Sequence, residues 1–230
     1  MKVTLTIDDI SSKNTPAIVD YLVANNIRAV MFAVGMNVEK YYDEAIYALK
    51  KGMIVGNHSY SHPAFSSLSF EAGVEDFENN EIVLDRLYKD AGVERIYKPV
   101  RFPYGDKGGA NKEKYQVYFA KKGFSKLKDT DITYPWWNEN GLNKDIDTLW
   151  TYDFEEYRVR PGSDFTFSDV CAKMSVTAPL QGGALYDETS SHIVLLHAHD
   201  ETEDMVPCYY KILIDKLIEH KAVFSIEFQK

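Results

Sequence analysis

Two histidines lie four residues apart in the segment GNHSYSH, residues 56–62, of a chain that has only six histidines. Residues at this interval lie on the same side of a helical turn, so His58 and His62 can both ligate one cation. Imidazole nitrogen suits Zn²⁺, especially where a carboxylate completes the ligand set and one position stays open for water. The same spacing also fits a surface or capping pair at the end of a strand.

Two adjacent carboxylates, Asp8 and Asp9, end an otherwise apolar segment near the start of the chain. Neighbouring carboxylates repel each other and favour a cation or an arginine close by. In a solvated turn such a pair has no special role. Beside two imidazoles, however, one carboxylate can bind a metal while the other transfers a proton.

These residues, together with the segment RFPY (101–104) and with His197, each follow an apolar run typical of a strand. We expect strands at 3–7, 28–34, 53–56, 193–199 and 222–228, an extended segment at 97–100, and helices at 15–26, 38–51, 69–91, 110–122 and 206–220. This alternation predicts an α/β fold, a distorted (β/α) barrel with a mainly parallel sheet. Because parallel strands end on one face of such a fold, we expect the four clusters to converge there.

The helical and strand periodicity fails between residues 124 and 150, where all three tryptophans of the chain lie. We expect a long loop there. Its Trp136 and Trp137 can stack on sugar rings as substrate-binding residues, or they can fill core. Since no linker or internal repeat is visible, residues 1–230 are predicted to form a single domain.

Composition narrows the classes of partner. A formal net charge of -9 without any basic run argues against a nucleic-acid partner. No window approaches the ~18 apolar residues that a membrane span needs. Since no leader peptide is visible either, the sequence as written predicts a cytoplasmic protein, although an extracellular protein trimmed of its leader would read the same way. Cys171 and Cys208 lack metal-site spacing and are either thiols or one bridge.

Five short segments resemble, in order, the motifs of the polysaccharide deacetylases, carbohydrate esterase family four. Thr6–Asp9 resembles the first motif, T-F-D-D-G, while GNHSYSHP and RFPYGD are similar to the second and third. Asp153-Phe154 resembles a fourth motif that ends in Asp-Trp, and Leu195–His197 fits the fifth, L-x-H. Their order and spacing agree from residue 3 to residue 228, so the resemblance covers nearly the whole chain.

The resemblance implies a single divalent metal ion held by Asp9, His58 and His62. The metal is usually zinc in this family and sometimes cobalt or nickel. Asp8 is then the general base that activates water, and Arg101 keeps this carboxylate ionised and oriented through charge-assisted hydrogen bonds.

The resemblance also implies how the substrate is handled. His197 is the general acid that protonates the departing amine, and Asp153 orients it. The main-chain N–H of Tyr104 stabilises the developing oxyanion. Leu195 and Phe154 form apolar walls around the acetyl methyl group.

Together these roles imply a metal-dependent hydrolase that removes N-acetyl groups from amino sugars or from N-acetylated oligosaccharides and polysaccharides. His199 is an alternative candidate for the general acid, because it lies on the same strand face as His197. Three departures concern substrate shape: Ile10 replaces the glycine of the first motif, Trp150 stands where the fourth motif often begins with Asp, and Phe154 replaces its Trp.

Two other functions are compatible with the sequence. The altered fourth motif and the missing leader permit an amidase or deformylase that acts on a small non-polymeric or lipid-linked substrate. A non-catalytic carbohydrate-binding relative is the third possibility. The presence of both Asp8 and His197 argues against the latter, because a structural metal needs neither residue.

Overall fold

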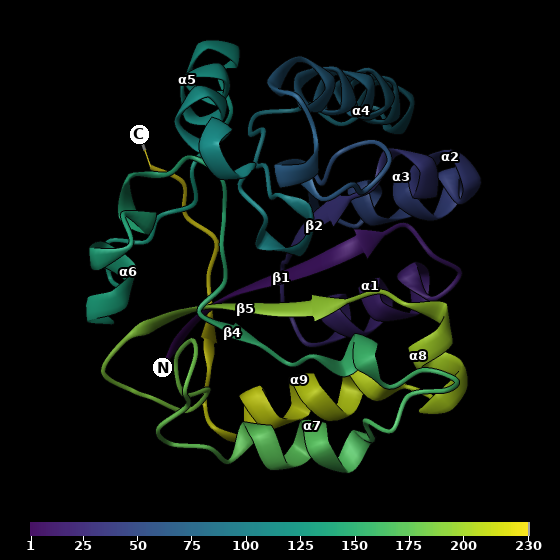
Figure 1. Cartoon of the computed structure of the whole chain (residues 1–230). Coiled ribbons are helices and arrows are strands. Elements are labelled where there is room, and N and C mark those ends of the chain that lie inside the picture. Colours follow the sequence, from purple (N-terminus) through teal and green to yellow (C-terminus); the bar gives the residue numbers. More distant parts are fainter. Residues whose placement is uncertain (230) are drawn as a thin grey trace.

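A parallel β-sheet lies at the centre of the molecule, which a computed structural model describes for residues 1–229 (Figure 1). Within those residues the strands are β1 (Lys2–Ile10), β2 (Val30–Ala33), β3 (Ile54–Asn57), β4 (Tyr152–Asp153), β5 (Ser191–His197) and β6 (Val223–Phe224). The order across the sheet is β3-β2-β1-β5-β4, and β6 pairs with the start of β1. All of these strand pairs are parallel, which confirms the predicted α/β class with a mainly parallel sheet.

Helices cover the sheet on both sides. They are α1 (Thr15–Ala24), α2 (Gly35–Lys40), α3 (Tyr42–Lys50), α4 (Phe70–Ala91), α5 (Lys112–Lys122), α6 (Pro135–Glu139), α7 (Phe167–Met174), α8 (Asp200–Met205) and α9 (Tyr209–Glu219). Figure 1 shows α2, α3, α4 and α5 on one side of β1, and α7, α8 and α9 on the other side of β5. The arrowheads of β1 and β5 point the same way, so their carboxyl ends share one edge of the sheet.

The central strand β1 is held by burial along its length. Val3, Leu5 and Ile7 are each 1 % exposed or less and belong to the main hydrophobic core. Thr6 is also buried, and its hydroxyl donates a hydrogen bond to the main-chain oxygen of Val194 on β5. Because β1 has a neighbouring strand at each edge and both faces of a parallel sheet are covered, its residues are buried. The end of β1 is therefore a rigid support for the residues that follow.

The long helix α4 matches the prediction for residues 69–91 closely. The Ser69 side chain caps its first turn by accepting the N–H of Ala72, and Gly92 ends it in a left-handed conformation that glycine adopts without strain. Its buried side includes Phe77 and Leu84. The helix therefore forms a fixed wall beside the end of β3.

An aromatic cluster supports the segment that contains Arg101. Phe102 is almost fully buried, and its ring packs edge-on against Phe65 and Phe77 at centroid distances of 5.1 and 5.3 Å. Tyr115 and Phe119 of α5 complete the cluster. Edge-to-face packing of this kind stabilises a chain segment beyond simple area burial, so residues 101–104 are anchored by their middle side chain.

Several predicted boundaries differ from the observed ones. The helix expected at 38–51 is divided into α2 and α3 at Tyr41, whose φ of -126° and ψ of 58° are not helical and whose carbonyl also accepts a hydrogen bond from the Ser11 hydroxyl. The strand expected at 222–228 pairs with β1 only through Val223 and Phe224. The short helices α6, α7 and α8 were not expected, and α6 lies inside the stretch predicted as loop.

Among the described residues, no helix is both long enough and apolar enough to cross a membrane. The prediction that residues 1–230 form a single domain stays a prediction.

Candidate metal centre

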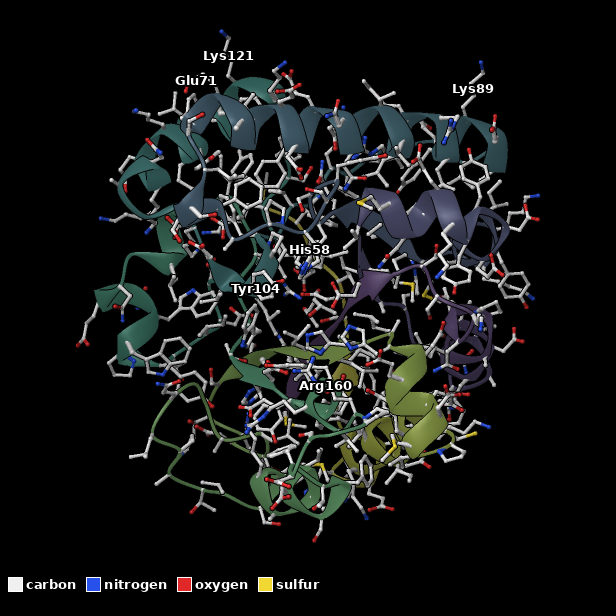
Figure 2. The ribbon with its side chains drawn as sticks, turned by 45° about the vertical axis from the view of Figure 1, so that its right-hand side comes forward. His58, Glu71, Lys89, Tyr104, Lys121 and Arg160 are labelled. Atoms are coloured by element: carbon white, nitrogen blue, oxygen red, sulfur yellow. The ribbon has the colours of Figure 1, made fainter. Side chains whose placement is uncertain are left out.

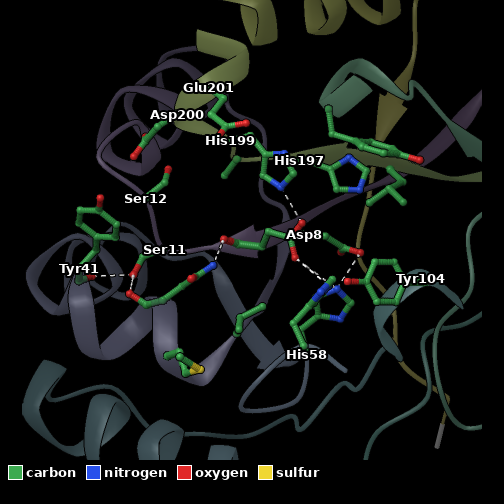
Figure 3. A pocket seen from close by; sticks show the side chains of 18 of the residues that line it. Asp8, Ser11, Ser12, Tyr41, His58, Tyr104, His197, His199, Asp200 and Glu201 are labelled. Atoms are coloured by element: carbon green, nitrogen blue, oxygen red, sulfur yellow. Dashed lines mark hydrogen bonds and ion pairs between the residues drawn. The ribbon is translucent and has the colours of Figure 1, made fainter. Parts of the chain in front are cut away.

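A cavity of about 800 Å³ opens at the carboxyl ends of β1, β3 and β5 (Figure 3). Its lining includes most of the residues singled out in the sequence: Asp8, Asp9, His58, His62, Tyr104, Trp150, Asp153, Leu195, His197 and His199. Asp9 and His199, which are 190 residues apart in the sequence, thus meet in one place, as expected for the ends of parallel strands.

A β-bulge brings both carboxylates of the Asp8-Asp9 pair into this cavity. Consecutive side chains of a regular strand point to opposite faces of the sheet. The register between β1 and β2 shifts between Ile7 and Ile10, and Asp9 adopts a left-handed conformation with φ of 64°. Asn37 supports this conformation by donating its side-chain N–H to the main-chain oxygen of Asp9. Bulges re-aim side chains in this way, and here the bulge lets Asp8 and Asp9 face the same space.

The two histidines of GNHSYSH are brought together by a loop rather than by a helical turn, so the expected helical geometry was wrong. His58 directly follows β3, and the loop reverses through left-handed conformations at Ser59 (φ 65°) and His62 (φ 57°). The Ser59 hydroxyl accepts the main-chain N–H of His62. Asp76 of α4 fixes the middle of the loop by accepting the main-chain N–H groups of Tyr60 and Ser61.

Asp9, His58 and His62 together fit a divalent cation. Each offers one ligand atom, and these atoms lie within 4.8 Å of one another. The Oδ1 atom of Asp9 lies 3.2 Å from Nε2 of His62 and 3.6 Å from Nε2 of His58. This oxygen is buried, yet within residues 1–229 it accepts no hydrogen bond. A buried carboxylate oxygen without a partner is costly, and a cation among the three groups satisfies it.

The protonation of His58 also suits a ligand. Its Nδ1 atom donates a hydrogen bond to the main-chain oxygen of Arg101 at 2.9 Å, which leaves Nε2 without a proton and facing Asp9. Such a bond to the outer nitrogen commonly fixes the tautomer of a ligating histidine. Burial lowers the pKa of His58, and the charges of Asp8 and Asp9 oppose this shift only in part. The ring is therefore neutral, as metal ligation requires.

The carboxylate of Asp9 stays ionised in spite of its surroundings. Burial raises its pKa, but the hydrogen bond from His199 and the imidazoles of His62 and His58 outweigh this effect. The pKa of Asp9 lies well below its usual value as a result. An ionised carboxylate oxygen and imidazole nitrogens form the ligand chemistry of a zinc site with positions left open.

Asp8 lies next to the three ligands but is held by Arg101. The Arg101 guanidinium is fully buried, and its Nη1 lies 2.7 Å from Oδ1 of Asp8. The other oxygen of Asp8, Oδ2, is 3.4 Å from Nε2 of His58. The carboxylate therefore has one oxygen fixed by a charge-assisted hydrogen bond and the other directed toward the ligand set.

His197 is held by Glu156, a residue that the sequence reasoning missed. The Oε1 atom of Glu156 accepts hydrogen bonds from the main-chain N–H of His197 and from its Nδ1 at 3.2 Å. Asp153, the residue expected to orient His197, lies within 4.8 Å of both but accepts the main-chain N–H of Glu155. Of these two carboxylates, Glu156 rather than Asp153 thus accepts the hydrogen bond that orients the His197 ring.

Charge around His197 changes its pKa strongly. Burial lowers the pKa, but Glu156, by its charge and its hydrogen bond, and Asp153, by its charge, outweigh burial and raise it to about 10. Burial raises the pKa of Asp153 to about 6. At neutral pH His197 is therefore an imidazolium with Nδ1 bonded to Glu156, which leaves Nε2 as the nitrogen available to the cavity.

The walls beside His197 differ from the expectation for Phe154. Phe154 is fully buried in the main core and does not line the cavity, so its assignment as a substrate wall was wrong. The aromatic ring at this place is Tyr157, whose centroid lies 4.6 Å from that of His197. Leu195, the other expected wall, does line the cavity. The acid-aromatic pair beside His197 is thus Glu156-Tyr157, three residues after Asp153-Phe154.

The mouth of the cavity carries exposed aromatic and basic side chains. Tyr104 has φ of 60° and packs its ring at 4.6 Å from His62, while most of the side chain remains exposed. Figure 2 shows His58 and Tyr104 on one side of this opening and Arg160 across from them. Left-handed conformations of non-glycine residues cluster at functional sites, and Asp9, His62 and Tyr104 all adopt them here.

The two tryptophans proposed to bind substrate, Trp136 and Trp137, do not line the cavity. Trp137 is buried beside Ile132 and Leu142, and its indole N–H donates to Asp129 at 3.0 Å. Trp136 packs against the same cluster. The core-filling alternative therefore describes this pair, and Trp150 is the tryptophan that reaches the cavity.

The sequence profile of the polysaccharide deacetylase family matches residues 1–121, which is more than half of the chain. The chain belongs to the polysaccharide deacetylase family. This match includes β1 with Asp8 and Asp9, the loop with His58 and His62, and the segment that begins at Arg101.

Two curated members of the polysaccharide deacetylase family align with part of the chain. A peptidoglycan N-acetylglucosamine deacetylase of Bacillus cereus is 34% identical over 108 residues, which are 46% of this chain and 37% of that protein. The peptidoglycan N-acetylmuramic acid deacetylase PdaC of Bacillus subtilis is 33% identical over 106 residues, 45% of this chain and 21% of that protein. The aligned region thus spans well under half the length of either relative.

Solved structures of polysaccharide deacetylases share the fold over nearly the whole chain. The peptidoglycan N-acetylglucosamine deacetylase Bc1960 has a TM-score of 0.65 at 20% identity, covering 97% of this chain and 85% of that one. A mutant of BA3943, described as a pseudoenzyme of carbohydrate esterase family four, has a TM-score of 0.60 at 21% identity, covering 97% of this chain and 64% of that one. This likeness confirms the predicted distorted barrel.

Proposed function

We propose that this polysaccharide deacetylase hydrolyses N-acetyl groups of amino sugars in glycan chains, with a divalent cation held by Asp9, His58 and His62. The observation that carries this proposal is the buried Oδ1 of Asp9, which faces two imidazole nitrogens and accepts no hydrogen bond within the described residues. Both curated relatives are named as deacetylases of peptidoglycan sugars, which supports the same class of substrate.

Catalysis needs more than the fold, because a pseudoenzyme shares it. When bound, the cation supplies Lewis acidity, which polarises an amide carbonyl and makes water more acidic. Asp8 lies beside the ligand set with Oδ1 fixed by Arg101, so its other oxygen is placed to accept a proton from water. A purely structural metal site requires no such carboxylate.

His197 is suited to the opposite proton transfer. Its pKa is raised, so the ring holds a proton at neutral pH, and Nε2 is the nitrogen that can give it to the departing amine. Glu156 keeps Nδ1 protonated and fixes the plane of the ring. Asp8 and His197 are paired across neighbouring strands, which places base and acid at one edge of the sheet.

The rest of the cavity suits a sugar. Leu195 offers an apolar surface near His197 for the acetyl methyl group, and such a surface also keeps competing water away. Trp150, Tyr104 and Tyr157 line the cavity with aromatic rings that can stack on pyranose faces. In this proposal the main-chain N–H of Tyr104 stabilises the oxyanion, as the family resemblance implies.

We propose Zn²⁺ as the resident ion, because one carboxylate oxygen and two imidazole nitrogens with open positions form a zinc-type set. Metal analysis of protein purified without added metal identifies the ion directly. Co²⁺ or Ni²⁺ in stoichiometric amount instead of zinc would change the identity of the ion and leave the site intact.

The proposed activity is tested by acetate release from N-acetylglucosamine oligomers of increasing length and from peptidoglycan fragments. We expect activity that disappears in chelator, returns with Zn²⁺ or Co²⁺, and increases with oligomer length. Asp8→Asn and His197→Ala are expected to abolish turnover while the variants still bind metal. Full turnover in both variants would contradict the assigned roles.

The same assay separates the alternatives. Turnover that does not increase with length, or that occurs only with small N-formyl or N-acetyl amides, indicates a small-substrate amidase or deformylase. Glycan binding without acetate release from any substrate indicates a non-catalytic relative. Either result would overturn the proposal for glycan chains.

A further inference from the structure

His199 lies beside the proposed metal site without belonging to its ligand set. The last residue of β5 is His197, and His199 follows two residues later, immediately before α8. The main-chain N–H of Ala198, between them, donates to the main-chain oxygen of Asp8 at 3.1 Å. This bond ties the segment to the end of β1, so the position of His199 relative to the Asp8-Asp9 pair is fixed by the main chain.

The contact between His199 and Asp9 is short. Nε2 of His199 lies 2.7 Å from Oδ2 of Asp9, and the dashed line at His199 in Figure 3 marks it. An ionised carboxylate only accepts hydrogen bonds, so Nε2 must carry the proton. With its proton directed at Asp9, this nitrogen cannot itself ligate the cation, and it is poorly placed to protonate a leaving group.

The two oxygens of Asp9 have different surroundings. Oδ2 accepts the hydrogen bond from His199, whereas Oδ1 faces His58 and His62 and accepts none within residues 1–229. Rotation of the carboxylate would break the bond from His199. The hydrogen bond therefore occupies one oxygen of the carboxylate and leaves the other for the ligand set.

We propose that His199 is a positioning residue that holds Asp9 as a one-oxygen ligand, with Oδ1 bound to the cation and Oδ2 locked by the imidazole. The inference rests on the metal site proposed above. Hydrogen-bond partners of metal ligands orient them and tune affinity, and their removal typically weakens metal binding by about 10- to 100-fold. His199 is the candidate for that role at Asp9.

Metal affinity tests this assignment without substrate. The dissociation constant for Zn²⁺ is measured by competition with a chromophoric chelator in the wild type, His199→Ala and His199→Gln. We expect His199→Ala to weaken binding by about 10- to 100-fold. The glutamine side chain also offers an N–H donor, so His199→Gln is expected to retain more of the affinity than His199→Ala.

A matched control removes a histidine elsewhere. His220 stacks on Tyr186 at a centroid distance of 3.6 Å and does not line the cavity, so His220→Gln is expected to bind Zn²⁺ like the wild type. The visible spectrum of Co²⁺-loaded protein provides a second readout. At saturating Co²⁺, His199→Gln should give the wild-type spectrum, because its side-chain N–H still occupies Oδ2 of Asp9 and the ligands themselves are unchanged.

Two outcomes would overturn the inference. Unchanged Zn²⁺ affinity in His199→Ala shows that the hydrogen bond does not position Asp9. An altered Co²⁺ spectrum of His199→Gln at saturation shows that His199 is itself a ligand. Because both measurements omit substrate, a protein whose metal affinity depends on His199 as expected but which releases no acetate refutes the proposed activity and leaves this inference standing.

Discussion

Arg101 and Asp8 form a buried ion pair that joins the third sequence cluster to the first. Besides its contact with Asp8 at 2.7 Å, Nη1 of Arg101 donates to the hydroxyl of Thr6, and Nε donates to the main-chain oxygen of Thr148. The ring of Phe32 lies 4.3 Å from the guanidinium carbon. One side chain therefore connects β1 with the segments at 101–104 and 145–150, while it orients the proposed base.

Removal of the Arg101 charge is expected to destabilise the fold as well as to reduce turnover. In Arg101→Met the carboxylate of Asp8 stays buried without its cation, and loss of one partner of a buried pair typically lowers the free energy of unfolding by about 3–5 kcal/mol. Urea unfolding followed by circular dichroism measures this change.

The control for Arg101→Met is an exposed pair. Lys122 lies 2.7 Å from Glu78 with both side chains nearly half exposed. Surface pairs of this kind contribute about 0–1 kcal/mol, so Lys122→Met should have a small effect. Equal losses of unfolding free energy in the two variants would show that burial of the Arg101 pair has no energetic consequence.

The contact between Glu156 and His197 predicts the alkaline limb of the pH profile. The charge and hydrogen bond of Glu156 raise the pKa of His197 against the effect of burial, so the acid form persists into alkaline solution. In Glu156→Gln this charge is absent and the pKa falls. The decline of kcat with rising pH is therefore expected to begin at lower pH in the variant, and a pH series of acetate release measures it.

Glu155→Gln is the matched control for this shift. Glu155 adjoins Glu156 but pairs with Lys173 and Arg158 instead of His197. Its variant should keep the alkaline limb of the wild type. If Glu156→Gln also keeps it, His197 does not act as the acid whose titration limits the rate, and another proton donor must be sought.

Metal binding should stabilise the folded chain, because the three ligands meet only in the folded state. A ligand present at a hundred times its dissociation constant stabilises the native state by about 2.7 kcal/mol. Added Zn²⁺ is therefore expected to raise the Tm of the wild type in a concentration-dependent manner. His58→Ala lacks one ligand and should show a much smaller increase, whereas an equal increase in both would place the bound ion elsewhere.

The convergence of the site was predictable because it depends on topology. Asp8, His58, Arg101 and His197 each follow an apolar run, and parallel strands place such positions at one edge. The local geometry was not predictable in the same way. The left-handed conformation of Asp9 is supported by a hydrogen bond from Asn37, which lies outside the first motif. The loop that joins His58 to His62 is fixed by Asp76 of α4, which lies outside the second motif.

Glu156 escaped prediction because two acid-aromatic pairs follow each other in the segment DFEEY. The first pair begins at the last residue of β4, Asp153, which lies beside the cavity, and Phe154 follows the strand into the core. A single 3-10 turn at Glu156–Arg158 then directs Glu156 inward to His197. Short turns leave no periodic signal in a sequence, so only the unusual burial of this glutamate, at 0 % exposure, reveals its role.

Trp137 and Trp150 provide a direct test of which aromatic residues serve the fold and which serve the substrate. Trp137 is buried and bonded to Asp129, so Trp137→Ala should lower the free energy of unfolding by about 3–5 kcal/mol, as large core truncations do. Trp150 lines the cavity and is only partly buried, so Trp150→Ala should raise KM for N-acetylglucosamine oligomers with a smaller loss of stability. Unfolding curves and oligomer kinetics of both variants decide the matter. A raised KM in a stably folded Trp137 variant would show that Trp137 contacts substrate, because truncation of a side chain that lies only in the core does not remove a contact with sugar.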